Sequence, residues 1–133
     1  MTQPFVHLHL HTEYSIVDST VRIPGLMAKA AENGMPAVAL TDQGKLFGLV
    51  KFYRKAFAHG VKPLIGVDLR VRNPEERDRP YALILLCQDL AGYRNLTRLV
   101  SRSYLEGQHR GVPMVEREWL DDGRVDGLIA LSG

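Results

Sequence analysis

The amino-acid sequence predicts an α/β fold in which strands and helices alternate along one domain. The first observation is a series of short apolar runs, such as residues 37–41 and 81–87, which are typical of strands covered on both faces. The second is that segments with apolar residues at helical spacing lie between these runs. This alternation predicts mainly parallel strands joined by right-handed crossovers. An open doubly wound sheet and a (β/α) barrel both satisfy the pattern.

The first predicted elements are a strand, a helix and a second strand. Residues 5–10 alternate histidine with apolar side chains, which fits a strand with one covered face. In the predicted helix 24–33, Pro24 suits the first turn and Gly34 is a stop signal after the last. The continuous apolar run 37–41 forms the second predicted strand.

A helix, a long strand and a loop follow. Residues 46–59 place apolar side chains on one helical side, and Gly60 ends that helix. Residues 62–71 form the third predicted strand, in which Gly66 allows a close approach to the backbone. The stretch 73–80 is charged and contains two prolines, so we expect a loop there.

The remaining residues continue the same alternation. Residues 81–87 form a fourth strand, and 89–104 form a helix with its leucines on one side. We expect a loop at 107–113 and a short helix at 116–121. Residues 128–131 form a fifth strand, after which a βα series should continue. The sequence thus predicts a chain cut from a larger domain, with open strand edges that favour self-association.

Composition is that of an ordinary globular domain. The chain has 133 residues, a net charge of +2 and 45% apolar residues. This charge is too small to indicate nucleic-acid binding by bulk electrostatics. The single cysteine, Cys87, excludes an internal disulfide and a thiolate zinc site within the chain. The sequence shows neither a secretory signal pattern nor a membrane-spanning stretch, so we expect a cytoplasmic protein without membrane contact.

Three histidines distinguish the first predicted strand. His7, His9 and His11 alternate with apolar residues, so on a strand all three imidazoles would share one face. Imidazole is a frequent metal ligand, which makes a metal site one interpretation. A half-exposed strand with solvated histidines is the other. If a metal binds, we expect His7 to orient a ligand or to bind a backbone carbonyl.

Two aspartates extend this candidate site. Sites in parallel α/β folds gather at the carboxyl ends of strands, which here supply His9, His11 and Asp42. Asp68 lies within the third predicted strand. Imidazoles and carboxylates from adjacent strands suit zinc, manganese or iron, which activate water against phosphate esters. Alternatively, Asp42 caps the following helix and Asp68 is solvated.

A basic cluster lies on or near the second predicted helix. Its members are Lys45, Lys51, Arg54 and Lys55. The simpler interpretation is a solvated helix face, in which the long side chains keep their charges in water. The functional interpretation is a surface for an acidic partner or for a phosphate backbone.

Six segments, in their order and spacing, resemble one family. That family is the PHP domain, which opens the alpha subunit of bacterial DNA polymerase III and is shared with histidinol phosphatases. The resemblance implies a distorted (β/α)7 barrel with up to three ions, such as Zn, Mn or Mg, at its carboxyl end. His9, His11 and Asp42 match ligands of that site. The segments are 7–15, 41–48, 51–53, 62–66, 95–101 and 127–133.

Two positions depart from the family pattern. Gln43 stands where the family has a histidine, and an amide oxygen is a weak ligand for zinc-like ions. Asp68 stands where the family has a glutamate, and its carboxylate is one methylene shorter. The other family ligands would follow residue 133. Residues 1–133 therefore correspond to a partial PHP domain, with the rest of the barrel and the polymerase domains absent, and we expect partial or no metal occupancy.

The resemblance implies a function in bacterial DNA replication. We expect a structural and subunit-binding platform without polymerase activity of its own, which contacts the other polymerase III subunits, especially the proofreading exonuclease. Contact with DNA would come through the parent protein. The alternative is an active metal-dependent phosphoesterase, either a pyrophosphatase or a 3′–5′ exonuclease, in which His9, His11, Asp42 and Asp68 hold the metals. An unrelated α/β binding module is a third interpretation.

Overall fold

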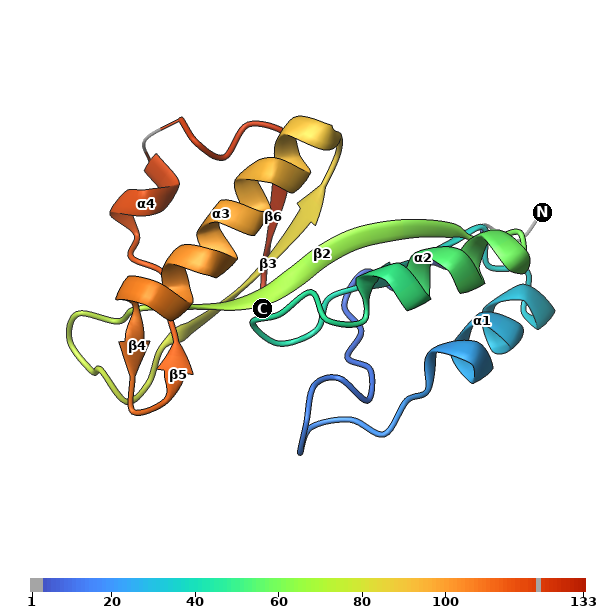
Figure 1. The fold of residues 1–133 in the computed structure, drawn as a ribbon, viewed down its shortest axis with the longest axis horizontal. Helices are drawn as coiled ribbons and strands as arrows, with labels where there is room; N and C mark the ends of the chain where they lie inside the picture. Colours follow the sequence, from blue (N-terminus) through green and yellow to red (C-terminus); the bar gives the residue numbers. More distant parts are fainter. Residues whose placement is uncertain (1–3, 122) are drawn as a thin grey trace.

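The computed structural model describes residues 4–121 and 123–133 of an α/β chain (Figure 1). The predicted strands and helices after residue 20 are present, with small shifts at their ends. Residues 107–113, predicted as a loop, contain a short hairpin. The elements are α1 (Ile23–Glu32), β1 (Ala37–Leu40), α2 (Leu49–Ala58), β2 (Lys62–Val71), β3 (Tyr81–Cys87), α3 (Leu90–Glu106), β4 (Gln108–His109), β5 (Val112–Pro113), α4 (Glu118–Asp121) and β6 (Leu128–Ser132).

The main sheet is mixed, so the prediction of mainly parallel strands is wrong. Its order is β1-β2-β3-β6, and β1 pairs with β2 in parallel. β2 and β3 are antiparallel, as are β3 and β6. Between β2 and β3 the chain forms only a loop over residues 72–80. A parallel connection needs a crossover of a dozen or more residues, so this short loop can only return as a hairpin.

The long connection between β3 and β6 reverses direction more than once. α3 carries the chain away from the end of β3, and the segment through α4 carries it back (Figure 1). The return is fixed beside the start of α3, where the Gln88 N–H donates to the Gly127 carbonyl (2.8 Å). The Asn95 side-chain amide donates to the Asp126 carbonyl (2.9 Å). β6 therefore begins next to the end of β3 and runs antiparallel to it.

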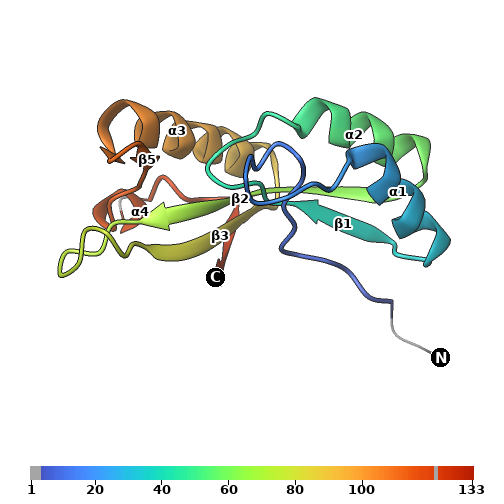
Figure 2. The same cartoon turned by 90° about the horizontal axis from the view of Figure 1, so that it is seen from below.

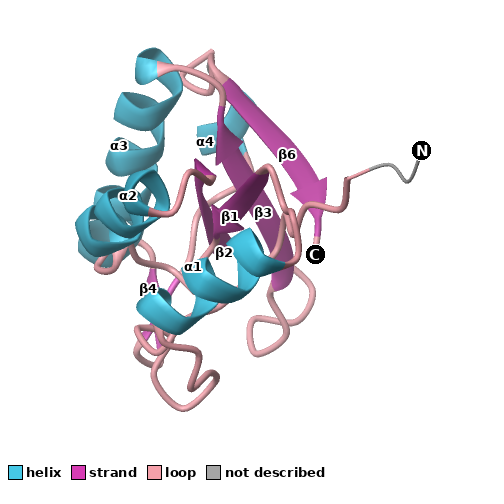
Figure 3. Cartoon of the chain, turned by 90° about the vertical axis from the view of Figure 1, so that its right-hand side faces the viewer, coloured by secondary structure: helices cyan, strands magenta, loops and turns pink. Residues whose placement is uncertain are grey.

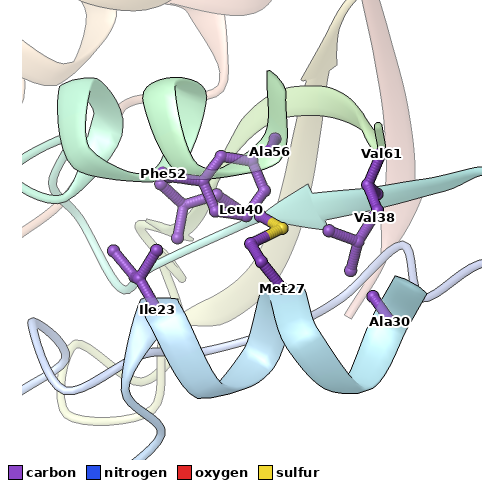
Figure 4. Packing of buried hydrophobic residues seen from close by; sticks show 8 residues of the cluster. All are labelled: Ile23, Met27, Ala30, Val38, Leu40, Phe52, Ala56 and Val61. Atoms are coloured by element: carbon purple, nitrogen blue, oxygen red, sulfur yellow. The ribbon is translucent and has the colours of Figure 1, made fainter. Parts of the chain in front are cut away.

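Helices α1, α2 and α3 lie on one face of the twisted sheet (Figures 2 and 3). One hydrophobic core fills the space between α1, α2 and β1 (Figure 4). α1 contributes its buried side chains at intervals of four and three residues, as an amphipathic helix does. Burying each large apolar side chain contributes about 1.5–3 kcal/mol. The buried members are Ile23, Met27, Ala30, Val38, Leu40, Phe52, Ala56 and Val61.

A second core lies under α3. Alternate side chains of β2 point into this core or to the opposite face of the sheet. Val67, Leu69 and Val71 join the core with side chains from β3 and α3. Because successive side chains on a strand point to opposite faces, Asp68 and Arg70 lie on the other face of β2. The same face of the sheet carries a smaller apolar cluster of Ala39, Ile84 and Leu86.

The segment with the alternating histidines is not a regular strand, contrary to the prediction for residues 5–10. It runs beside β1, where the Ala39 N–H donates to the His7 carbonyl (2.9 Å) and the Thr41 N–H to the Leu10 carbonyl (3.0 Å). Two steps along β1 therefore match three along the segment, which breaks the period of two. The Leu10 N–H donates to the Thr41 hydroxyl (2.7 Å). Strand alternation thus does not set the directions of the histidines.

Candidate metal centre

Two of the three histidines converge on one carboxylate oxygen. His9 Nε2 and His11 Nε2 each lie 2.9 Å from Asp68 Oδ2. One ligand atom from each residue lies within 4.8 Å of the others, which is the spacing of a group that could hold a metal ion. The His11 Nδ1 contacts the Asp18 carboxylate, and this contact fixes the orientation of the ring.

The backbone explains how residues so distant in sequence meet. The chain leaves β1 and continues past Thr41 alongside β2, forming a single parallel bridge between Gln43 and Asp68. The Asp68 N–H donates to the Asp42 carbonyl (3.1 Å), and the Gly44 N–H donates to the Asp68 carbonyl (2.8 Å). Asp68 is therefore level with the residues that follow β1, although it lies in the middle of β2.

Arg70 holds the second oxygen of the same carboxylate. Its Nη1 donates to Asp68 Oδ1 at 2.6 Å, and the Asp68 side chain is only 3% exposed. Burial by itself raises the pKa of Asp68, but the hydrogen bonds from His9 and His11 and the charge of Arg70 outweigh it. The pKa of Asp68 therefore lies below its usual value, and the carboxylate is ionised at neutral pH.

Asp42 is buried and bonded to the turn that follows the histidines. Its carboxylate accepts hydrogen bonds from the Thr12 N–H (2.6 Å), the Thr12 hydroxyl (2.8 Å) and the Ser15 hydroxyl (2.8 Å). Its side chain does not cap α2, which begins seven residues later at Leu49. Among the described residues, the group with metal-binding spacing consists of His9, His11 and Asp68 and does not include Asp42.

His7 and Gln43 lie at the margin of the cluster. The His7 ring is exposed and contacts the Phe5 ring edge-on, with 4.7 Å between the ring centroids. The Gln43 N–H donates to the Ser15 hydroxyl (3.0 Å), so its backbone belongs to the turn held by Asp42. The Gln43 side chain lines a cavity of about 250 Å³. Asp68, Arg70 and Tyr104 line the same cavity, together with Gly44, Lys45 and the β4–β5 hairpin residues Gly111, Val112 and Pro113.

The donor set fits one zinc-like ion. Two imidazole nitrogens and a carboxylate oxygen are the ligands of many catalytic zinc sites, which leave a further position open. A bound ion of this kind would supply Lewis-acid activation of water and of a phosphate ester. Four residues of this site were not singled out in the sequence: Thr12, Ser15, Asp18 and Arg70. Arg70 could have been found, because residues two apart on a strand share a face. Nothing in the sequence pattern links Asp42 to the Thr12–Ser15 turn.

Comparison with known proteins identifies the family. The model of the PHP domain family matches residues 7–133, so the chain belongs to the PHP domain family. It is 48% identical over 132 residues to the DNA polymerase III subunit alpha of Pseudomonas aeruginosa, and 45% identical over 134 residues to that of Vibrio cholerae. These alignments cover 99% and 100% of this chain but only 11% and 12% of the relatives. The chain thus matches the PHP domain at the N-terminus of DNA polymerase III alpha subunits, and the predicted resemblance is confirmed.

Solved structures with a similar fold are more distant in sequence. A protein from Bifidobacterium adolescentis assigned as a metal-dependent phosphoesterase superposes with a TM-score of 0.57 and 17% identity, covering 75% of this chain and 33% of that one. An amidohydrolase from Chromobacterium violaceum, solved with bound sulfate and no metal, gives 0.58 and 22%, covering 74% and 32%. These likenesses show the fold.

None of the helices in the described residues is long and apolar enough to span a bilayer.

Proposed function

We propose that this chain serves a DNA polymerase III alpha subunit mainly as a structural and subunit-binding platform, with a weak metal site. We infer that residues 1–133 form the first part of a PHP domain in a longer cytoplasmic bacterial protein, whose polymerase chemistry and DNA contacts lie elsewhere. The relatives' name and their much greater length support this inference.

The observation that carries the platform proposal is the hydrogen bonding of Asp42, which matches a family ligand. Its carboxylate accepts three hydrogen bonds within the protein. Gln43 offers a neutral amide where the family has a histidine. The cluster then has three donors for at most one ion, instead of the larger set that the family uses. A phosphoesterase with several metals needs more anionic ligands than these.

We propose a surface for a partner subunit between α3 and residues 45–47, which precede α2. A groove of about 550 Å³ has an apolar lining that includes Leu46, Phe47, Val100 and Leu105. Phe47 is 73% exposed and Leu105 84% exposed, which is unusual for large apolar side chains. Both α3 and α2, the helix that follows residues 45–47, are basic, since α2 has three basic and no acidic residues and α3 has three arginines and one glutamate. This combination suits an acidic segment with apolar anchors, for which we propose the proofreading exonuclease subunit.

Binding of the exonuclease subunit to the chain, measured by calorimetry, tests the platform proposal. Leu105→Ser should weaken binding at least tenfold, because it removes an apolar contact from the groove. Leu90→Ser is the matched control, since Leu90 is 63% exposed on the same helix but does not line the groove. Equal affinity of the wild type and the Leu105→Ser variant would reject this surface. Oligomers of the chain alone would indicate self-association through open strand edges.

The second candidate function is a metal-dependent phosphoesterase. The convergence of His9, His11 and Asp68 favours it. Metal content by mass spectrometry, with Zn²⁺ or Mn²⁺ added, and hydrolysis of a phosphate ester test it against a His9→Ala, His11→Ala double variant. Metal-dependent hydrolysis that the double variant lacks would overturn the platform proposal as stated. If the wild type binds metal weakly and Gln43→His binds it more tightly, this result would support the platform proposal.

A further inference from the structure

The negative charge of Asp68 in the histidine–aspartate cluster is already neutralised by Arg70. Asp68 presents one oxygen to His9 and His11 and the other to Arg70. At 2.6 Å the Nη1–Oδ1 contact is as short as a charge-assisted hydrogen bond can be. The Arg70 side chain is 23% exposed, and its carboxylate partner is 3% exposed. The pair is therefore inside the protein, where ionic interactions are screened far less than at the surface.

A divalent ion at this cluster and the Arg70 guanidinium would share one carboxylate. Both are cations, and two positive charges held this close to one buried carboxylate repel each other. Arginine cannot lose its proton to relieve the repulsion, as a lysine can. The ion would thus meet a carboxylate whose charge is already neutralised, and its affinity would fall accordingly.

We propose that Arg70 is the resident cation of this cluster and sets its low affinity for divalent metal ions. The guanidinium keeps the Asp68 carboxylate compensated and in place, so that the histidine segment docks on β2 without an ion. This inference rests on the proposed function, in which the cluster is a weak metal site, and it names the residue responsible. Gln43 removes a ligand, whereas Arg70 adds a positive charge, so their effects on metal binding are separable.

The neighbouring Arg72 offers a matched control. Arg72 follows β2 directly, two residues after Arg70, is similarly buried, and pairs with Glu116 at 2.9 Å instead of with the cluster. Removing its side chain takes away the same positive charge without changing the contacts of Asp68. A general effect of losing an arginine from this part of the chain would appear in both variants.

The experiment is a titration with Co²⁺, followed by visible absorption, and with Zn²⁺, followed by calorimetry. Arg70→Gln keeps a hydrogen-bond donor for Asp68 but loses the charge, and Arg70→Met loses both. We expect both variants to bind at least tenfold more tightly than the wild type, while Arg72→Met stays within threefold of it. His9→Ala added to Arg70→Gln should abolish the gain. Circular dichroism establishes that each variant is folded, and Arg70→Gln decides the question if Arg70→Met unfolds.

The outcomes separate this inference from the proposed function. Unchanged metal affinity in Arg70→Gln, or an equal gain in Arg72→Met, overturns the role of Arg70 and leaves the platform proposal standing. Tight stoichiometric binding by the wild type, with metal-dependent hydrolysis, overturns both. Failure of the exonuclease subunit to bind, with a metal gain in Arg70→Gln that His9→Ala abolishes, overturns the platform but supports the role of Arg70.

Discussion

Replacing Asp42 by alanine should destabilise the protein strongly even when no metal ion is present. Asp42 is fully buried, and its carboxylate accepts hydrogen bonds from the Thr12 N–H, the Thr12 hydroxyl and the Ser15 hydroxyl. All three donors are themselves in buried residues. The variant would leave them without this acceptor, in a place where water cannot easily replace it.

The size of the effect follows from these contacts. A hydrogen bond to a charged group contributes about 1.5–3 kcal/mol to the free energy of unfolding. The three bonds share one carboxylate, and its removal also relieves the cost of burying a charge, so the net loss should be about 3–5 kcal/mol. Typical domains have free energies of unfolding of about 5–15 kcal/mol, so the variant should lose about a fifth or more of its stability.

Urea unfolding in the presence of EDTA, followed by far-UV circular dichroism, measures this loss. Asp78→Ala is the control, because Asp78 is 61% exposed and pairs only with surface groups, and it should change the free energy by less than about 0.5 kcal/mol. If Asp42 served mainly as a metal ligand, removing its charge from the metal-free protein would be nearly neutral or stabilising. A loss under about 1 kcal/mol in Asp42→Ala would therefore refute the reasoning.

Three further predictions concern packing and reactivity. A Cβ at Gly92 would lie 2.0 Å from the Gly127 carbonyl oxygen, so Gly92→Ala should lower stability by about 1–3 kcal/mol in thermal melts. Gly25→Ala, in open space on α1, should instead raise stability by about 0.5–1 kcal/mol, and an equal response at both glycines would contradict this. Phe52→Ala empties the first core and should cost about 3–5 kcal/mol in urea unfolding, and a cost below 1 kcal/mol would mean that this core is not packed as described. Burial raises the pKa of Cys87 to about 11, so at pH 8 its thiolate fraction is about 200-fold below that of a free thiol. Labelling of Cys87 with dithionitrobenzoate should therefore be more than tenfold slower than labelling of a free thiol, and labelling at the free-thiol rate would contradict the burial.

The sequence predicts the regular elements best where the local pattern and the tertiary context agree. The bounds of β2 and β3 match the predicted 62–71 and 81–87, because both strands are apolar, β-rich and bounded by turn signals. The histidine segment fails because its pairing with β1 has an extra residue, and the Thr41 hydroxyl replaces a ladder bond. No local pattern reports such a long-range substitution.

The antiparallel direction of β2 and β3 follows from the length of one loop. The charged stretch 73–80 with its two prolines indicates a loop, and its length alone rules out a parallel return from β2 to β3. For the site, the strand pattern points to His9, His11, Asp42 and Asp68, and of these the fold brings His9, His11 and Asp68 together. Whether Asp42 and the others bind metal stays a prediction. The environment of each group, such as Arg70 on Asp68 or the Thr12 turn on Asp42, depends on contacts that only the folded chain makes.

The change of partner along β2 has a mechanical consequence. Residues 62–65 pair with β1, and residues 66–71 pair with β3, so one strand joins two separately packed halves. The joint falls at Gly66, two residues before Asp68, where a side chain would collide with the Leu85 carbonyl. The imidazoles belong to one half and the Arg70 cavity borders the other half. A twist of the two halves about Gly66 would change the distances between the imidazoles of His9 and His11 and the Asp68 carboxylate. The geometry of this cluster therefore depends on how the two halves are oriented.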